Sequence, residues 1–148
     1  MKYLFVFGNT PNLSRAEIDA VLPSFTTVFF KDETFVLETE EQLDEKLFDL
    51  LGGTVKVAIE ADLNETVTSD FGISDYTHKV NILKLSKEIK QNTGHRYVLP
   101  QKGTTLSSVV VRKQKLTELI FTEKGLFKTI WIQDFEAWNK RDYGRPET

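Results

Sequence analysis

Hydrophobic and polar positions over the first 61 residues predict four strands. The unbroken apolar run at residues 3–7 is typical of a strand buried on both faces. Residues 26–31 and 34–38 are rich in strand-forming residues and flank two acidic residues, which predicts a hairpin. Residues 54–60 alternate Val and Ile with more polar residues, which indicates a half-exposed strand.

Two helices are predicted between these strands. Ser14 and Glu17 have the spacing of a capping box, and Pro23 would stop the helix that they open. A second, amphipathic helix is predicted from Thr39 to a stop at Gly52-Gly53. Its apolar stripe consists of Leu43, Leu47, Leu50 and Leu51.

The resulting order over residues 1–61, β-α-β-β-α-β, predicts a ferredoxin-like domain. The first and third strands would be central, because they carry the densest apolar runs, and the alternating fourth strand suits an edge. Residues 62–75 are polar and read as a linker or irregular connection. The predicted fold class is α+β, with this domain followed by a small α/β unit over residues 76–133.

That second unit is predicted to contain a helix from residue 76 to a stop at Gly94. Its buried stripe would be Ile82, Leu85 and Ile89. A short strand follows at residues 96–99, and two more are expected at 116–121 and 127–132. Between them, Thr105 or Ser107 could cap a helix, although three successive Val residues also suit a strand.

Charge divides the chain into two parts. Residues 1–75 hold 5 Lys and Arg against 15 Asp and Glu, whereas residues 76–148 hold 14 against 7. The net charges, −10 and +7, sum to the −3 of the whole chain. A basic half favours a phosphate-bearing partner, while the plainer interpretation is one acidic and one basic solvated surface.

The sequence offers little catalytic chemistry. Neither His78 nor His95 has a metal-ligand partner at a suitable spacing, so no metal site and no catalytic residue are predicted. Ser107-Ser108 has no base beside it in sequence, and helix capping is its expected role. The chain has no Cys and no run of about 18 apolar residues, so we expect a cytoplasmic protein that does not cross a membrane.

Basic and aromatic residues are interleaved in the second half. Such clusters suit RNA, because Lys and Arg bind phosphates while aromatic rings stack on unpaired bases. The alternative is that Tyr97 and Trp138 are core residues and the charges only solvate the surface. The candidate RNA-binding residues are Arg96, Lys102, Arg112, Lys113, Lys115, Lys140, Arg141 and Arg145.

The run Ile132-Gln133-Asp134-Phe135-Glu136-Ala137-Trp138-Asn139-Lys140-Arg141-Asp142-Tyr143-Gly144-Arg145-Pro146 resembles a junction in THUMP-containing tRNA guanine-N(2) methyltransferases. In that family, the run joins an N-terminal RNA-binding region to a Rossmann-like catalytic domain. Three further stretches are similar to that N-terminal region: residues 51–56, 71–74 and 107–113. The resemblance covers nearly the whole chain.

The resemblance implies a ferredoxin-like domain over residues 1–61, a THUMP-like RNA-binding unit over 76–133 and a junction over 134–148. The catalytic domain would follow Pro146. This chain has neither the glycine-rich turn for S-adenosylmethionine nor the family's acidic-Pro-Pro-aromatic motif. A methyltransferase domain carrying that cofactor would therefore come from a longer form of the chain or from another chain, and this region alone would be inactive.

The sequence leaves three functions to compare. The first is an RNA-binding, substrate-positioning region of a tRNA methyltransferase, with tRNA or another structured RNA as partner. The second is a complete enzyme of another kind, which the missing catalytic residues disfavour. The third is a ferredoxin-like regulatory or dimerisation module that binds a small ligand. The +7 charge of the second half favours the first over the third.

Overall fold

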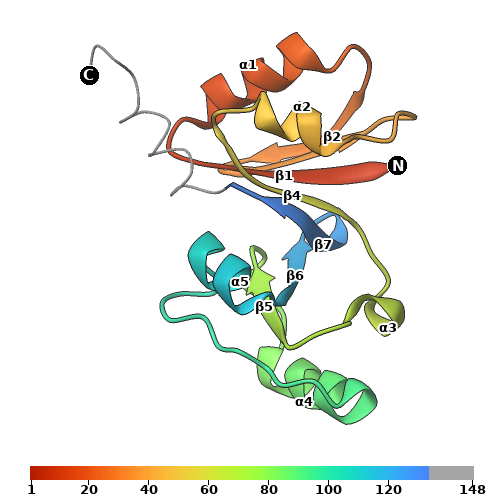
Figure 1. Ribbon diagram of the computed structural model, residues 1–148, viewed down its shortest axis with the longest axis vertical. Helices are drawn as coiled ribbons and strands as arrows, with labels where there is room; N and C mark the ends of the chain where they lie inside the picture. Colours follow the sequence, from red (N-terminus) through yellow and green to blue (C-terminus); the bar gives the residue numbers. More distant parts are fainter. Residues whose placement is uncertain (134–148) are drawn as a thin grey trace.

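A computed structural model describes residues 1–133, apart from the side chains of residues 64 and 65, and shows an α+β protein built on one mixed sheet (Figure 1). The strands are β1 (Lys2–Phe7), β2 (Thr26–Lys31), β3 (Thr34–Glu38), β4 (Thr54–Glu60), β5 (Phe71–Asp75), β6 (Thr117–Thr122) and β7 (Gly125–Ile132). The helices are α1 (Pro11–Val21), α2 (Glu45–Asp49), α3 (Leu63–Thr66), α4 (Ile82–Thr93) and α5 (Ser108–Gln114). In this part of the chain, no helix combines the length and apolar character needed to cross a membrane.

The seven strands are ordered β2-β3-β1-β4-β7-β6-β5. All neighbours are antiparallel except β5 and β6, which run parallel. The expectation that β4 lies at an edge is wrong, because β1 pairs with one side of it and β7 with the other. Residues 76–133 therefore do not form a separate sheet: β7 and β6 continue the sheet of the first four strands.

The predicted connection at residues 62–75 contains a strand. All five residues of β5 are buried, although Ser74 and Asp75 are polar. A search for apolar residues does not find this strand, because two of its five residues are polar. Polar side chains can be buried in a strand when they have hydrogen-bond partners. Both have them: Ser74 Oγ lies 2.6 Å from Glu118 Oε2, and Asp75 accepts a bond of 2.8 Å from the backbone N–H of Thr77.

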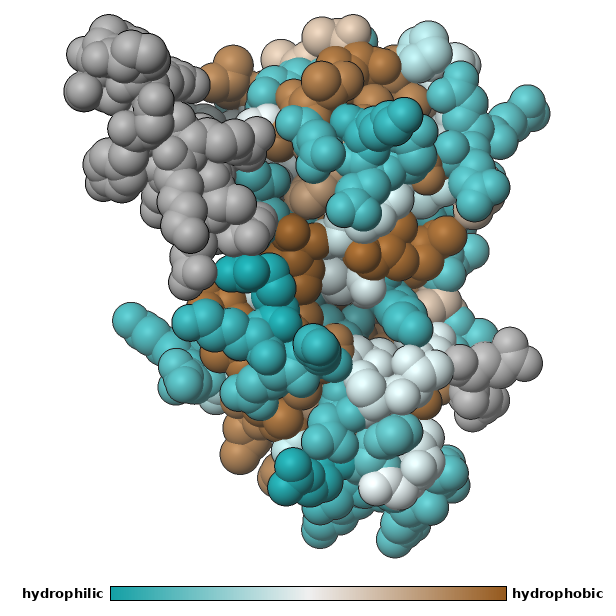
Figure 2. Space-filling view, in the orientation of Figure 1, coloured by the Kyte–Doolittle hydropathy of each residue, from teal (hydrophilic) through white to brown (hydrophobic). Residues whose placement is uncertain are grey.

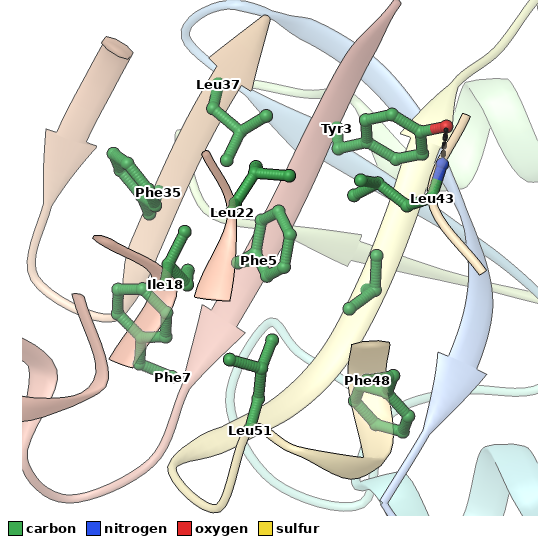
Figure 3. Packing of buried hydrophobic residues seen from close by; sticks show 11 residues of the cluster. Tyr3, Phe5, Phe7, Ile18, Leu22, Phe35, Leu37, Leu43, Phe48 and Leu51 are labelled. Atoms are coloured by element: carbon green, nitrogen blue, oxygen red, sulfur yellow. Dashed lines mark hydrogen bonds between the residues drawn. The ribbon is translucent and has the colours of Figure 1, made fainter. Parts of the chain in front are cut away.

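The first core lies between the first four strands and the layer of α1 and α2 (Figures 1 and 3). Alternate residues of β1 point into it, and the Phe7 and Phe35 rings are stacked with centroids 5.9 Å apart. Burying each large side chain of this kind contributes about 1.5–3 kcal/mol. Tyr3 adds a polar contact, because its hydroxyl accepts a 3.1 Å bond from the backbone N–H of Leu43.

Helix α1 begins four residues earlier than the capping-box spacing predicts. Thr10 is its N-cap residue and Pro11 its first residue, a position where the missing N–H of proline costs nothing. Ser14 is buried inside the helix and donates to the carbonyl oxygens of Thr10 and Gly53. Glu17 accepts from the backbone N–H groups of the Gly52-Gly53 turn, at 3.1 and 2.9 Å. The pair thus ties α1 to the start of β4.

Helix α2 is much shorter than the predicted helix that begins at Thr39. Asp44 caps it by accepting from the backbone N–H of Leu47. Upstream, Thr39 Oγ1 bonds the carbonyl of Ser24 and accepts from the backbone N–H of Glu41, so those groups are used outside a helix. The predicted stripe is right at Leu43 and Leu51, which are buried, and wrong at Leu50, which is 65% exposed.

The opposite face of the sheet is buried by the sheet itself. Leu4, Val36 and Ala58 from the first strands cluster with Ile120 of β6 and Phe127 of β7. The sheet must therefore curl, so that β6 comes close to β1 and β3. An ion pair between Lys31 and Glu123, with 3.6 Å between Nζ and Oε1, joins the β2-β3 hairpin to the β6-β7 turn. This curl places the acidic and basic parts of the chain in one body.

A third cluster lies under α4, at the far end of the molecule from α1 (Figure 1). The predicted stripe is confirmed: Ile89 is buried, and Ile82 and Leu85 pack against Phe71 and Leu119. Asn81 caps the helix, and Gly94 ends it in the left-handed region with φ of 75°. The helix begins later than residue 76, because the segment before it is bonded to Asp75.

The two glycines of the α2-β4 turn give a matched test. A Cβ on Gly53 would lie 2.1 Å from Ser14 Oγ and 3.0 Å from Ser14 Cβ, whereas a Cβ on Gly52 would be 3.5 Å from its nearest neighbour, Glu17. We predict that Gly53→Ala destabilises the protein by about 1–3 kcal/mol and that Gly52→Ala changes it by less than about 0.5 kcal/mol. Urea unfolding measures both; equal midpoints would contradict this close packing.

Phe48 and Leu50 test the face of α2. Phe48 is 4% exposed and stacks on Trp131 of β7 at 6.1 Å between ring centroids. We predict that Phe48→Ala costs about 3–5 kcal/mol, because it removes a buried ring and leaves a cavity. Leu50→Ala should cost under about 0.5 kcal/mol, since that side chain is in solvent. A larger loss in thermal stability for the Leu50 variant would reverse the assigned face.

Candidate nucleic-acid interface

The basic helix α5 carries three of the predicted RNA-binding residues. The three successive Val residues, which suit a helix or a strand, lie in a helix. Ser107 caps this helix: its Oγ accepts from the backbone N–H of Val110 at 3.2 Å. Arg112 and Lys113 lie in its last turn, and Lys115 is the C-cap residue with φ of 52°. Cations here also complement the partial negative charge of the helix C-terminus.

Buried apolar residues hold this helix against the sheet. Val111 is 3% exposed and Leu106, just before the N-cap residue, is 4% exposed. Lys113 and Lys115 are exposed, and Arg112 is half-buried. The apolar side of the short helix thus fixes which side presents positive charge to solvent.

Lys102 lies in the exposed loop that leads to α5. It lines a small cavity of about 140 Å³ together with Leu99, Ser107 and Val110. Seven helical residues span about 10 Å. Lys102 therefore stands near the start of α5, while Lys115 stands at its end.

Arg96 forms an ion pair with Asp70 and is not part of the basic cluster at the end of α5. Its side chain is 86% exposed and its Nη2 lies 3.4 Å from Asp70 Oδ2. The backbone N–H of Arg96, at 2.9 Å from Asp70 Oδ1, is the main cause that lowers the pKa of the Asp70 carboxyl. An exposed pair of this kind is weak and is screened by salt, so the guanidinium stays available to a stronger anion.

Tyr97, one of the proposed stacking residues, belongs to the core. Its ring lies 5.5 Å from that of Phe71, and burial raises the pKa of its hydroxyl. The aromatic ring of the cluster at residues 95–97 thus contributes to core packing rather than to an exposed stacking surface. His95 Nδ1 lies 3.9 Å from Asp70 Oδ1, and His78 is exposed with φ of 59°.

Helix α4 adds a second basic surface that the sequence prediction of RNA-binding residues did not include. Lys84, Lys87 and Lys90 are exposed and recur every third residue, opposite the buried stripe. The spacing of these lysines can be read from the sequence. It does not identify an RNA-binding surface, however, because lysines on any solvated helix face show the same spacing. The face drawn in Figure 2 is mostly hydrophilic over α4 and α5. Lys140, Arg141 and Arg145, like Trp138, lie outside the described residues.

The sheet also contains a buried ion pair that sequence reasoning missed. Lys56 Nζ of β4 lies 2.7 Å from Glu118 Oε2 of β6, and the side chains are 3% and 0% exposed. The two residues are 62 positions apart and each stands in an ordinary strand pattern. No local signal could have paired them.

Residues 1–133 contain no metal-binding cluster, and their adjacent glycines do not form a phosphate cradle. Within residues 1–133, no group of three or more His, Asp or Glu is placed to hold a metal ion. The adjacent glycines 52 and 53 follow a helix and precede a strand, the reverse of a phosphate cradle, and their N–H groups are bonded to Glu17. This turn therefore does not fit S-adenosylmethionine.

Comparison with known proteins provides no family assignment. No model of a protein family matches the chain, and no curated protein matches it significantly.

Asp75 holds the loop between β5 and α4 through hydrogen bonds. This loop carries Lys79. Asp75 is 1% exposed and accepts from the backbone N–H and the hydroxyl of Thr77, at 2.8 and 2.6 Å, and from the backbone N–H of Val80, at 3.0 Å. Burial by itself raises the pKa of this carboxyl, but the bonds from Thr77 and Val80 together hold it below its usual value. The loop is thus held best by the ionised form.

Because the pKa of Asp75 is lower in the folded state than in the unfolded state, its ionised carboxyl stabilises the fold. This contribution is fully present above the pKa of an unfolded Asp, near 3.9, and is lost as the pH falls through the pKa of the folded state. We therefore predict that Asp75→Asn costs about 1–2 kcal/mol at pH 7. Below about pH 4 the difference from wild type should shrink. Urea unfolding of both proteins from neutral to acidic pH measures it, and a constant difference across that range would contradict the role of the charge.

Proposed function

We propose that this chain is an RNA-binding, substrate-positioning region that works with an S-adenosylmethionine-dependent tRNA guanine-N(2) methyltransferase domain. The supporting observation is the exposed positive charge of residues 76–133. These residues hold 11 Lys and Arg against 3 Asp and Glu, and Glu118 is buried beside Lys56 while Glu123 pairs with Lys31. Two of the three acidic residues of this part are therefore paired with lysines from the acidic half.

The arrangement of the strands supports the same proposal. The antiparallel order β2-β3-β1-β4, with α1 and α2 over one face, is the order expected of a ferredoxin-like domain. We assign β5, α4, α5, β6 and β7 to a THUMP-like unit that shares the sheet. β5 belongs with this unit because its parallel partner is β6, so the unit begins before residue 76.

In this proposal the basic surfaces of α4 and α5 track the phosphates of a folded RNA. Each Lys or Arg that neutralises a phosphate releases a counterion, so affinity falls steeply with salt. The acidic half contributes little affinity and repels RNA, which orients the bound molecule. Catalysis belongs to the methyltransferase domain, and this region presents the substrate to it.

The test is a salt titration of tRNA binding. For Arg112→Ala/Lys113→Ala/Lys115→Ala, we predict weaker binding and a log–log slope that is shallower by roughly 0.7–0.9 for each phosphate that is no longer neutralised. A matched pair of double variants gives the control. Lys113→Ala/Lys115→Ala removes two charges from the end of α5 and should weaken binding, whereas Lys2→Ala/Lys46→Ala removes two charges from the acidic half and should bind like wild type. Electrophoretic mobility shift or fluorescence anisotropy measures both.

Two results would count against the proposal. Undetectable binding of tRNA at low salt would remove it in favour of a ferredoxin-like regulatory or dimerisation module. Equal losses in the two double variants would show that net charge, rather than the α5 surface, governs binding. A single-stranded RNA of the same length should bind less tightly than tRNA, because the surface would read shape as well as charge.

A further inference from the structure

Four neighbouring strands contribute one polar side chain each to a continuous network on the sheet face that α5 covers. The contributors are Lys56 of β4, Thr129 of β7, Glu118 of β6 and Ser74 of β5. Glu118 is at the centre. Its Oε2 lies 2.7 Å from Lys56 Nζ and 2.6 Å from Ser74 Oγ, and its Oε1 accepts from Thr129 Oγ1 at 2.7 Å.

The network reaches out of the sheet at one residue, Leu106. Lys56 Nζ donates to the carbonyl oxygen of Leu106 at 2.9 Å, and the backbone N–H of Leu106 donates to Ser74 Oγ at 2.9 Å. Both backbone groups of this residue are therefore held by buried side chains. Its side chain lies on Gly72 of β5, where an added Cβ would be 2.2 Å from Leu106 Cδ1.

Leu106 immediately precedes Ser107, the residue that caps α5. A residue anchored at its N–H, its carbonyl and its side chain sets the position and direction of the chain that follows it. The next two turns carry Val111 into the core and Arg112 and Lys113 toward the basic end of α5. The start of this helix is thus anchored through the buried ion pair.

Stability alone is a weak reason for such a pair. Removing two charges from water is costly, and replacing a buried ion pair by apolar residues of similar volume is often neutral or stabilising. What an apolar pair cannot supply is a donor for the Leu106 carbonyl. The position of the loop therefore depends directly on the ammonium group.

We propose that Lys56 and Glu118 are positioning residues for α5: through Leu106 they hold the RNA-facing helix in the orientation that presents its basic end. The consequence for RNA rests on the proposed function, whereas the positioning of α5 does not. It makes a lysine from the acidic half of the chain a determinant of RNA affinity without contact to RNA.

The experiment uses Lys56→Met/Glu118→Leu, which removes both charges and keeps the volume. Three quantities are measured: the urea midpoint, hydrogen exchange of the backbone amides at residues 104–114, and tRNA affinity at low salt. We expect exchange in this segment, relative to the other protected amides, to be at least about tenfold faster, because the variant has no charged hydrogen bond to the loop. The urea midpoint shows how much of any change in exchange is global. The tRNA affinity should fall by at least about tenfold, with exchange elsewhere unaltered.

Thr129→Val is the matched control. It removes a bond to the same carboxylate, but Thr129 bonds Glu118 rather than Leu106. Global stability should fall, while exchange at residues 104–114 relative to the other protected amides should match wild type. Gly72→Ala approaches the anchor from the other side: it retains both charges and displaces Leu106. It should reproduce the faster exchange, and it keeps the proposal testable if the double variant does not fold.

Wild-type exchange at residues 104–114 in the double variant, or in Gly72→Ala if the double variant is unfolded, would overturn the positioning role. Faster exchange with unchanged tRNA affinity would overturn its consequence for RNA. If the wild-type chain does not bind tRNA, the proposed function fails, and the exchange data still decide whether the pair positions α5.

Discussion

The pairing of β4 with β7 holds this protein together. Val57 lies opposite Trp131 and Ile59 opposite Lys128, so the last described strand is joined to a strand from the first half of the chain. Without this pairing, β4 would be an exposed edge, and the strands of the second half would lack the neighbour that connects them to the first. With it, two groups of strands become one sheet with two covered faces.

The curl of the sheet follows from the same pairing. A sheet with helices on one side only leaves its other face uncovered, and a large apolar face in water is unfavourable. Here Ile120 and Phe127 fold back onto Leu4 and Val36, so the sheet covers its own open face. The buried polar network then fills the remainder of that face, where α5 and Leu106 cover it.

This construction separates charge in space while keeping the two parts rigidly connected. Acidic residues outnumber basic ones 15 to 5 over residues 1–75, and exposed lysines lie on α4 and at the end of α5. Only a few opposite charges of the described residues meet across the boundary, as in Lys56 with Glu118 and Lys31 with Glu123. A phosphate-bearing partner would therefore approach one end of the molecule, since Lys and Arg attract it there and Asp and Glu repel it elsewhere.

Local patterns in the sequence determined much of the secondary structure. The apolar run of β1, the β2-β3 hairpin and the stripe of α4 were all predicted, because each depends on spacing within a few residues. The basic character of α5 could also be read directly. The sequence left open whether this segment is a helix or a strand. The structure shows a helix, capped at Ser107 and Lys115.

Tertiary contacts decided the rest. The polar strand β5, the interior place of β4 and the short α2 each contradict a local signal. In each case a distant partner supplies the reason: Glu118 for Ser74, β7 for β4, and Tyr3 for the backbone of Leu43. The anchoring of α5 through Lys56 has the same origin. Local spacing encodes which elements form, but burial of a polar group depends on partners that only the folded chain brings within hydrogen-bond distance.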